Sequence, residues 1–150
     1  MIEKIKPVMA LLSSQFYEHN RENTEILSKQ NRPYLVLLVE YRGLKFAIPF
    51  RSHIQHTHAY KFQGEDSQRK ASGLDFSKSV LILNEDEIGP PAHLIPAERN
   101  ELLKRFNFIV EKFHCYIDDF IEGLKKEPLQ PKYRMSSLTY YKDILLKSEK

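Results

Sequence analysis

The segment 31–62, NRPYLVLLVEYRGLKFAIPFRSHIQHTHAYKF, predicts two strands, a tight turn and a polar loop in immediate succession. Residues 34–41 form an almost wholly apolar run rich in β-branched and aromatic side chains, which is typical of a central strand covered on both faces. Arg42 and Gly43 supply the turn, because glycine readily adopts a positive φ. Hydrophobic side chains then alternate from Leu44 to Phe50, which predicts a second strand with one apolar face.

Pro49 predicts where this hairpin ends. Proline has no backbone N–H, so we expect regular pairing to end near Pro49 and the chain to leave the sheet there. The loop that follows carries one arginine, one serine and three histidines: Arg51, Ser52, His53, His56 and His58. Polar side chains held by a loop at the end of a rigid sheet are often functional. This loop is therefore the candidate functional region.

The rest of the chain predicts supporting elements. An edge strand is predicted near residues 5–11, because Pro7 confines it to an edge of the sheet. Further strands are predicted at 60–62, 73–83 and 93–95, and a linker is predicted over 84–91. A short helix capped by Ser13 or Ser14 is predicted to end at His19, and a further helical turn is predicted at 24–27. A last helix is predicted from Leu138 to Leu146, capped by Ser136 or Ser137.

A long amphipathic helix is predicted from Ala97 to about Lys126, where large hydrophobic side chains recur every three or four residues. Pro96 suits the first turn of that helix, and Pro128 ends it. Within it, Cys115 is expected to be a small buried hydrophobic side chain and not a nucleophile. The whole pattern predicts one α+β domain over residues 1–150, with an antiparallel sheet wrapped by helices.

The composition is that of an ordinary soluble globular protein, with 150 residues of which 41% are hydrophobic and 29% are charged. The longest apolar run, residues 35–39, is far too short to cross a bilayer, and the N-terminus lacks the apolar core of a signal peptide. A single cysteine excludes an internal disulfide framework and fits a reducing compartment.

Positive charge is concentrated in the strand-rich half of the chain. Residues 1–84 hold 12 Lys and Arg against 8 Asp and Glu, a balance of +4, whereas residues 85–150 hold 11 against 12, a balance of −1. Four of the six histidines also lie in the first part. This asymmetry indicates an anionic partner such as nucleic acid, although a solvated surface is the simpler interpretation of the charge alone.

The histidine-rich loop admits two chemistries. Zinc accepts imidazole ligands, but no cysteine or acidic residue accompanies HIQHTH, so neither a metal nor a cofactor is predicted. The other use is proton transfer in RNA cleavage, since histidine serves as acid or base near neutral pH. Arg51 and Arg32 would hold the phosphate by fork geometry, and Ser52 would bond a phosphate oxygen. The candidate RNA contacts are Lys45, His53, His58, Tyr60 and Lys78.

A family resemblance supports the second chemistry. The segment RPYLVLLVEYRGLKFAIPFRS, followed by His56 and later by GLDFSKSVLIL, resembles the ToxN/AbiQ-like toxins of type III toxin–antitoxin systems, in particular the CptN and TenpN branches. The family order of glycine turn, Lys-aromatic and Pro-apolar-Thr-Ser is matched by Gly43, Lys45, Phe46, Pro49, Phe50 and Ser52, with Arg51 in place of the threonine.

Two family lysines fall on other residue types here. A catalytic lysine before the first strand falls on Arg32, and a lysine two positions past the serine falls on Ile54, which makes His56 the natural substitute. The C-terminal SSLTYYKDI also resembles the start of the family's last helix.

The resemblance implies a cytoplasmic bacterial endoribonuclease toxin with a compact, twisted antiparallel sheet similar to that of MazF and Kid. It implies metal-independent cleavage that leaves a 2′,3′-cyclic phosphate. The inhibitor would be a small repeated pseudoknot RNA that the toxin cuts from its precursor and with which it forms a heteromeric complex. In this interpretation His56 transfers the proton, Arg51 and Arg32 neutralise phosphate charge, and Ser52 positions the phosphate. The alternatives are a non-catalytic RNA-binding module and a zinc hydrolase.

Overall fold

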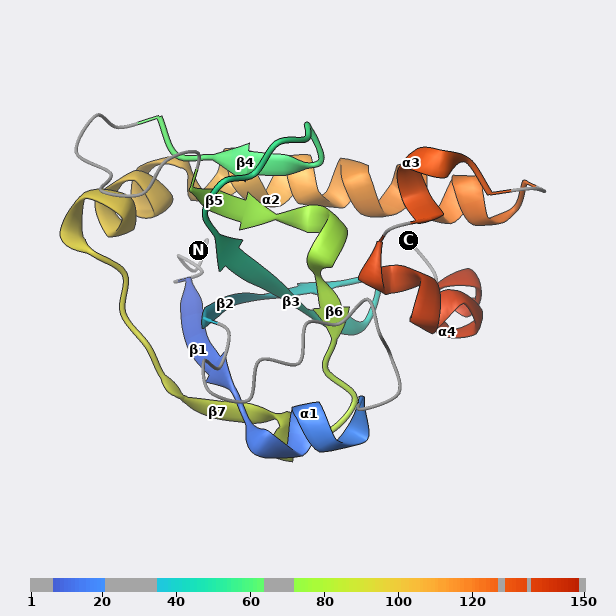
Figure 1. Ribbon diagram of the computed structural model, residues 1–150, viewed down its shortest axis with the longest axis horizontal. Coiled ribbons are helices and arrows are strands. Elements are labelled where there is room, and N and C mark those ends of the chain that lie inside the picture. The colour runs from blue at the N-terminus through green and yellow to red at the C-terminus, as the bar shows by residue number, and fades with distance from the viewer. Residues whose placement is uncertain (1–6, 21–34, 64–71, 127–128, 135, 149–150) are drawn as a thin grey trace, which may run out of the picture.

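The computed structural model describes residues 7–20, 35–63, 72–126, 129–134 and 136–148 (Figure 1). The predicted helical turn at 24–27 lies outside these residues, as do Arg32 and Tyr34. No helix in the described part of the chain is long and apolar enough to span a bilayer.

The predicted hairpin is present and forms the centre of the sheet. Strand β2 (Leu35–Tyr41) pairs antiparallel with β3 (Leu44–Arg51), from Val36 opposite Pro49 to Tyr41 opposite Leu44. The turn residues Arg42 and Gly43 have φ of 56° and 73°. Two successive positive φ values give the turn whose twist matches that of the paired strands, and glycine adopts one of them without a steric penalty.

The turn is tied to two distant parts of the chain. The Arg42 guanidinium donates from Nε and Nη2 to Oδ1 of Asp118, at 3.2 and 3.0 Å, and from Nη1 to the carbonyl of Ser148 at 3.4 Å. The Tyr41 hydroxyl donates to the same Asp118 carboxylate at 2.9 Å. These bonds join the hairpin end to the long helix and to the C-terminal segment.

Among the described residues the sheet has seven strands in the order β4-β5-β3-β2-β1-β7, with β6 also paired to β3, and every pairing is antiparallel. The remaining strands are β1 (Val8–Leu12), β4 (Ala59–Lys61), β5 (Gly73–Asp75), β6 (Val80–Leu81) and β7 (Ile88–Pro91). The predicted α+β class with an antiparallel sheet is confirmed.

Three strand predictions are wrong in detail. The chain does not leave the sheet at Pro49, because β3 continues to Arg51. Strand β3 pairs with β6 near its start and with β5 at its end. Strand β1 is not an edge strand, since the segment expected to be a linker forms β7 and pairs with it. Residues 93–95 form no strand, and residues 73–83 form β5, the 3-10 helix η1 (Phe76–Lys78) and β6 instead of one strand.

The helices confirm most of the sequence signals. Helix α1 (Ser14–His19) is capped by Ser13, and the long helix α2 runs over Pro96–Leu124, close to the predicted bounds. The other helices described are η2 (Glu85–Glu87), α3 (Pro131–Arg134), η3 (Ser137–Tyr141) and α4 (Lys142–Lys147). The predicted last helix is therefore split into η3, which Ser136 caps, and α4. Cys115 is exposed on α2, so its predicted burial is wrong.

Helix α2 supplies much of the core. It runs along the β4–β5 end of the sheet, with α3 and α4 beside its C-terminal half (Figure 1). Phe113 is fully buried and contacts Phe46 of β3 and Phe76 of η1 edge-on, at ring-centroid distances of 5.3 and 5.4 Å. Each such side chain contributes about 1.5–3 kcal/mol. Both faces of β3 are covered, since Ala47 is also 0% exposed.

Close backbone packing fixes the position of β5. A Cβ atom on Gly73 would lie 1.9 Å from the carbonyl oxygen of Tyr60 on β4. Tyr60 is itself held, because its hydroxyl donates to Glu101 of α2 at 2.5 Å, and the backbone N–H of Gln63 donates to the same carboxylate. Residue 73 must therefore be glycine for β4, β5 and α2 to keep this arrangement.

We expect Gly73→Ala to lower the free energy of unfolding by at least about 2 kcal/mol, because the methyl group meets backbone that α2 holds in place. Gly43→Ala is the matched control. Its Cβ has no atom within 4 Å, so only the left-handed φ is penalised, at about 1–2 kcal/mol. Urea unfolding followed by circular dichroism measures both variants. A smaller loss in Gly73→Ala than in Gly43→Ala would contradict the role given to Gly73.

Candidate functional site

The candidate site is built on one buried carboxylate, that of Asp75. Asp75 ends β5, is 1% exposed and caps η1. Its Oδ1 accepts from the backbone N–H of Ser77 at 3.1 Å and from the Ser77 hydroxyl at 2.6 Å. This local turn explains why the chain leaves the strand after Asp75, since aspartate side chains readily bond the amide two residues on. The two bonds from Ser77 fix the orientation of the carboxylate within its own segment of the chain.

Two of the predicted catalytic side chains meet at Asp75. Arg51, at the end of β3, donates from Nη1 to Oδ2 at 2.9 Å. His56, in the following loop, places Nε2 at 3.2 Å from Oδ1 and at 3.3 Å from the Ser77 hydroxyl oxygen. The Arg51 side chain is 34% exposed and that of His56 is 42% exposed. Both side chains are therefore anchored from inside and open to solvent outside.

The hydrogen bonds of His56 define which nitrogen carries its proton. Nδ1 accepts from the backbone N–H of His58 at 3.1 Å, so the neutral ring bears its hydrogen on Nε2 and donates it towards Asp75 or Ser77. A carboxylate on one ring nitrogen orients the imidazole and stabilises the positive charge formed when the other nitrogen takes a proton. Nδ1, at the exposed side of the loop, is the nitrogen that can exchange a proton with a substrate.

His58 lies beside His56 in a different environment. Its ring stacks on Tyr133 of α3 at 5.7 Å and contacts Tyr116 of α2 at 5.2 Å, while the His56 ring is 6.2 Å away. Burial lowers the pKa of His58, the positive charges of His56 and Lys132 lower it further, and Asp75 opposes them. His58 is therefore neutral at neutral pH.

The two aromatic residues that pack against His58, Tyr116 and Tyr133, make further contacts of their own. The Tyr116 hydroxyl donates to Oγ of Ser136 at 3.3 Å, and burial raises the Tyr116 pKa far above its ordinary value, so it stays a neutral phenol. The Lys132 ammonium lies 5.0 Å from the centre of the Tyr133 ring. Helix α2 thus brings one aromatic ring to the loop, and α3 brings a second ring and a cation.

Other predicted residues lie outside the Asp75 cluster. Ser52 is partly exposed and has no hydrogen bond to a described residue, and His53 is exposed with a left-handed φ of 58°. Lys78 is partly exposed on η1. Lys45 lies six residues before Arg51 on β3, about 20 Å away at strand spacing, with its ammonium 3.5 Å from Glu85.

Tyr60 requires a correction. The sequence predicts it as an RNA contact, but it is 2% exposed, its ring lies against Phe62 and Phe108, and its hydroxyl donates to Glu101. Burial, followed by the Glu101 bond, raises the Tyr60 pKa to about 12. Tyr60 offers no ring face to RNA, so we remove it from the candidate RNA surface.

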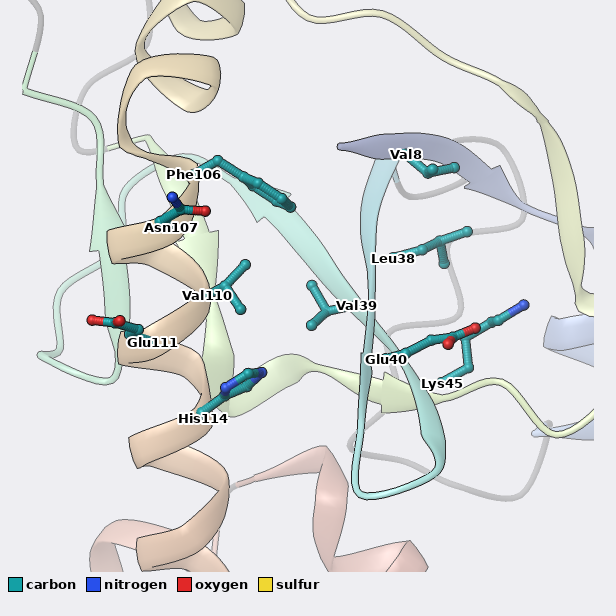
Figure 2. Close-up of a pocket in the computed structure, with 10 residues that line it drawn as sticks. All are labelled: Val8, Leu38, Val39, Glu40, Lys45, Phe106, Asn107, Val110, Glu111 and His114. Atoms are coloured by element: carbon teal, nitrogen blue, oxygen red, sulfur yellow. The ribbon is translucent and has the colours of Figure 1, made fainter. Parts of the chain in front are cut away.

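A separate cavity of about 570 Å³ lies between α2 and the β1–β2–β3 part of the sheet (Figure 2). Its lining comprises Val8, Leu38, Val39, Glu40, Lys45, Phe106, Asn107, Val110, Glu111 and His114. The His114 ring stacks on Tyr41 at 3.8 Å, its Nε2 has no hydrogen-bond partner among the described residues, and burial lowers its pKa. The cavity has the size of a small-ligand pocket but includes neither Arg51 nor His56.

Within the described ranges, no three or more His, Cys, Asp or Glu side chains are grouped so that they could hold a metal ion. Sequence reasoning missed Asp75, Ser77 and the rings of Tyr116 and Tyr133. The signal for Asp75 was present, because an acidic residue within a segment predicted to be a core strand needs a partner. The two tyrosines gave no such signal, since aromatic residues at helical spacing are ordinary core residues.

Comparison with known proteins adds no assignment: no family model, no curated protein and no solved structure matches the chain.

We expect Asp75→Asn to lower the free energy of unfolding by about 1–3 kcal/mol, because the amide cannot satisfy Arg51, His56 and Ser77 together. Asp119→Asn, an exposed change on α2, is the control and should stay within about 0.5 kcal/mol of the wild type. Urea unfolding measures both. Equal stability of the two variants would remove Asp75 as the anchor of the site.

Histidine titration by NMR should separate two side chains. His58 should titrate below 6.5, because burial lowers its pKa, and His19 should titrate above 6.5, because Glu87 accepts a hydrogen bond from it. The unfolded chain therefore binds more protons at His58, and the stability contributed by neutral His58 is lost as the pH falls below 6.5. The contribution of His19 has the opposite sign and is lost as the pH rises through its raised pKa. A His58 pKa at or above that of His19 would contradict the buried placement.

Proposed function

We propose that this chain is a metal-independent endoribonuclease, the toxin of a type III toxin–antitoxin system. The observation that carries the proposal is the joint anchoring of Arg51 and His56 by buried Asp75, with both side chains partly open to solvent. A phosphate-binding cation and a proton-transfer group side by side are what cleavage by 2′-hydroxyl attack requires. The ToxN/AbiQ-like sequence pattern is the second support.

Arg51 binds the scissile phosphate. A guanidinium has five N–H donors in a planar fork, and the contact with Asp75 uses Nη1 alone, so further donors remain for phosphate oxygens. The negative charge that develops on the phosphorus oxygens strengthens these bonds in the transition state. Ser52, directly after Arg51 and partly exposed, bonds a further phosphate oxygen.

His56 exchanges the proton. Asp75 fixes the ring through Nε2, and the RNA displaces the His58 amide from Nδ1 to reach the exchanging nitrogen. The cost of displacement is small, because that bond is exposed and a typical hydrogen bond is worth about 0.5–1.5 kcal/mol net.

In this function the partner is a small repeated pseudoknot RNA that the toxin processes and with which it forms a heteromeric complex in the bacterial cytoplasm. The basic excess of residues 1–84 suits such a partner. The finer similarity of the sheet to that of MazF and Kid is part of the same proposal. Tandem short repeats in the DNA just upstream of the reading frame would support it.

The test is incubation of the purified protein with bacterial RNA in EDTA, followed by detection of 2′,3′-cyclic phosphate ends and mapping of the cut sites. We expect cleavage by the wild type and a loss of about 10²–10⁴-fold in His56→Ala. His93→Ala, an exposed histidine before α2, is the matched control and should cleave at the wild-type rate.

Three outcomes would change the assignment. Cleavage at the normal rate by His56→Ala removes His56 from the mechanism. Salt-sensitive RNA binding without product favours the non-catalytic RNA-binding module. Activity that disappears in EDTA favours a metal-dependent hydrolase.

A further inference from the structure

The loop between β3 and β4 holds two histidines in opposite environments. His56 faces the carboxylate of Asp75 and the hydroxyl of Ser77. His58 lies against the rings of Tyr116 and Tyr133, and the positive charge of Lys132 lowers its pKa. Enzymes that need an acid and a base at one pH obtain them from paired titratable groups whose surroundings favour different protonation states.

We propose that His58 is the general base of RNA cleavage and His56 the general acid. This inference rests on the proposed function and assigns a second catalytic residue to the same site. The ring centroids are 6.2 Å apart, so one phosphodiester group bound by Arg51 can contact both imidazoles.

His58 suits the base because it is unprotonated before substrate binds. The groups facing it are Tyr116 of α2, Tyr133 and Lys132 of α3, His56 of its own loop and, more weakly, Asp75. Burial is the largest cause of its lowered pKa, and the two cations act in the same direction. A neutral imidazole has a lone pair that can accept the proton, and the contacts with Tyr116 and Tyr133 fix the orientation of the ring.

His56 suits the acid because it faces a negative charge that is present before the substrate arrives. The groups facing it are Asp75, Ser77, Arg51 and His58. In the imidazolium form Nε2 donates to the carboxylate, and the second proton is on Nδ1. That proton occupies the lone pair with which Nδ1 accepts the hydrogen bond from the His58 backbone N–H. Protonation therefore breaks this bond and makes the Nδ1 proton available to the substrate.

The step balances without any other reactant. His58 removes the proton of the 2′-hydroxyl, and the 2′-oxygen forms a bond to phosphorus. The bond from phosphorus to the 5′-oxygen breaks, and that oxygen takes the Nδ1 proton of His56. The products are a 2′,3′-cyclic phosphate and a 5′-hydroxyl, with His58 protonated and His56 neutral.

The test changes the leaving group. An RNA oligonucleotide spanning a mapped cut site is made with sulfur in place of the bridging 5′-oxygen, because a thiolate leaves without being protonated. On the oxygen substrate, His56→Ala and His58→Phe should each lose about 10²–10⁴-fold in rate. On the sulfur substrate, His56→Ala should recover to within about tenfold of the wild type, because it needs no acid, whereas His58→Phe should remain slow.

Two controls guard the interpretation. His58→Phe keeps an aromatic ring that can stack on Tyr133 and removes both nitrogens, although its ring is larger. His58→Ala must therefore give the same pattern. His93→Ala should match the wild type on both substrates.

Each outcome is decisive. If the sulfur substrate restores the cleavage rate of the His58 variants and not that of His56→Ala, the two roles are reversed and the inference is overturned. It is also overturned if the rate of every variant is restored, or of none. If the wild type cleaves no RNA, so that no cut site can be mapped, the proposed function itself is refuted. If the wild type cuts both substrates but the variants give any pattern other than the expected one, only the assignment of the two histidines is refuted.

Discussion

The arrangement of the candidate site depends on one buried negative charge. Asp75 is 1% exposed, and an isolated carboxylate at such a position would be very unfavourable. It is tolerated because a backbone amide, a hydroxyl and a guanidinium donate hydrogen bonds to it, and an imidazole nitrogen lies 3.2 Å from it. Because the buried carboxylate needs these partners, Arg51 from β3 and His56 from the next loop lie at one point. The stability of the fold and the geometry of the site therefore have a common origin.

The central strand places that charge where a substrate can approach. Strand β3 pairs with β2 along its length, with β6 near its start and with β5 at its end. The pairing of Arg51 with Gly73 puts Asp75 only two residues further along β5, within reach of the guanidinium. Gly73 makes this approach possible, because any side chain there would collide with β4. A backbone requirement at one residue thus sets the distance between two side chains of the site.

Sequence periodicity predicted the hairpin and α2 because each buries a regular pattern of large side chains. The pattern could not reveal β7, since GPP resembles a linker and pairs only through its contact with β1. It also missed the break after Asp75, where a side-chain bond to the Ser77 amide replaces the strand. Arg51 and His56 were predictable from residue type and position in the loop. Their shared anchor, and the packing of His58 on Tyr133, depend on contacts between segments far apart in the chain.

The hairpin turn shows how strongly a short connection can be constrained. Arg42 reaches Asp118 on α2 and Ser148 near the end of the described chain, so two distant segments converge on a two-residue turn. An inserted or deleted residue there would displace the guanidinium from both acceptors and would also shift the register of β2 against β3. Length variation, which surface turns usually accept, should therefore be rare at this one, and relatives of the chain should differ in size elsewhere.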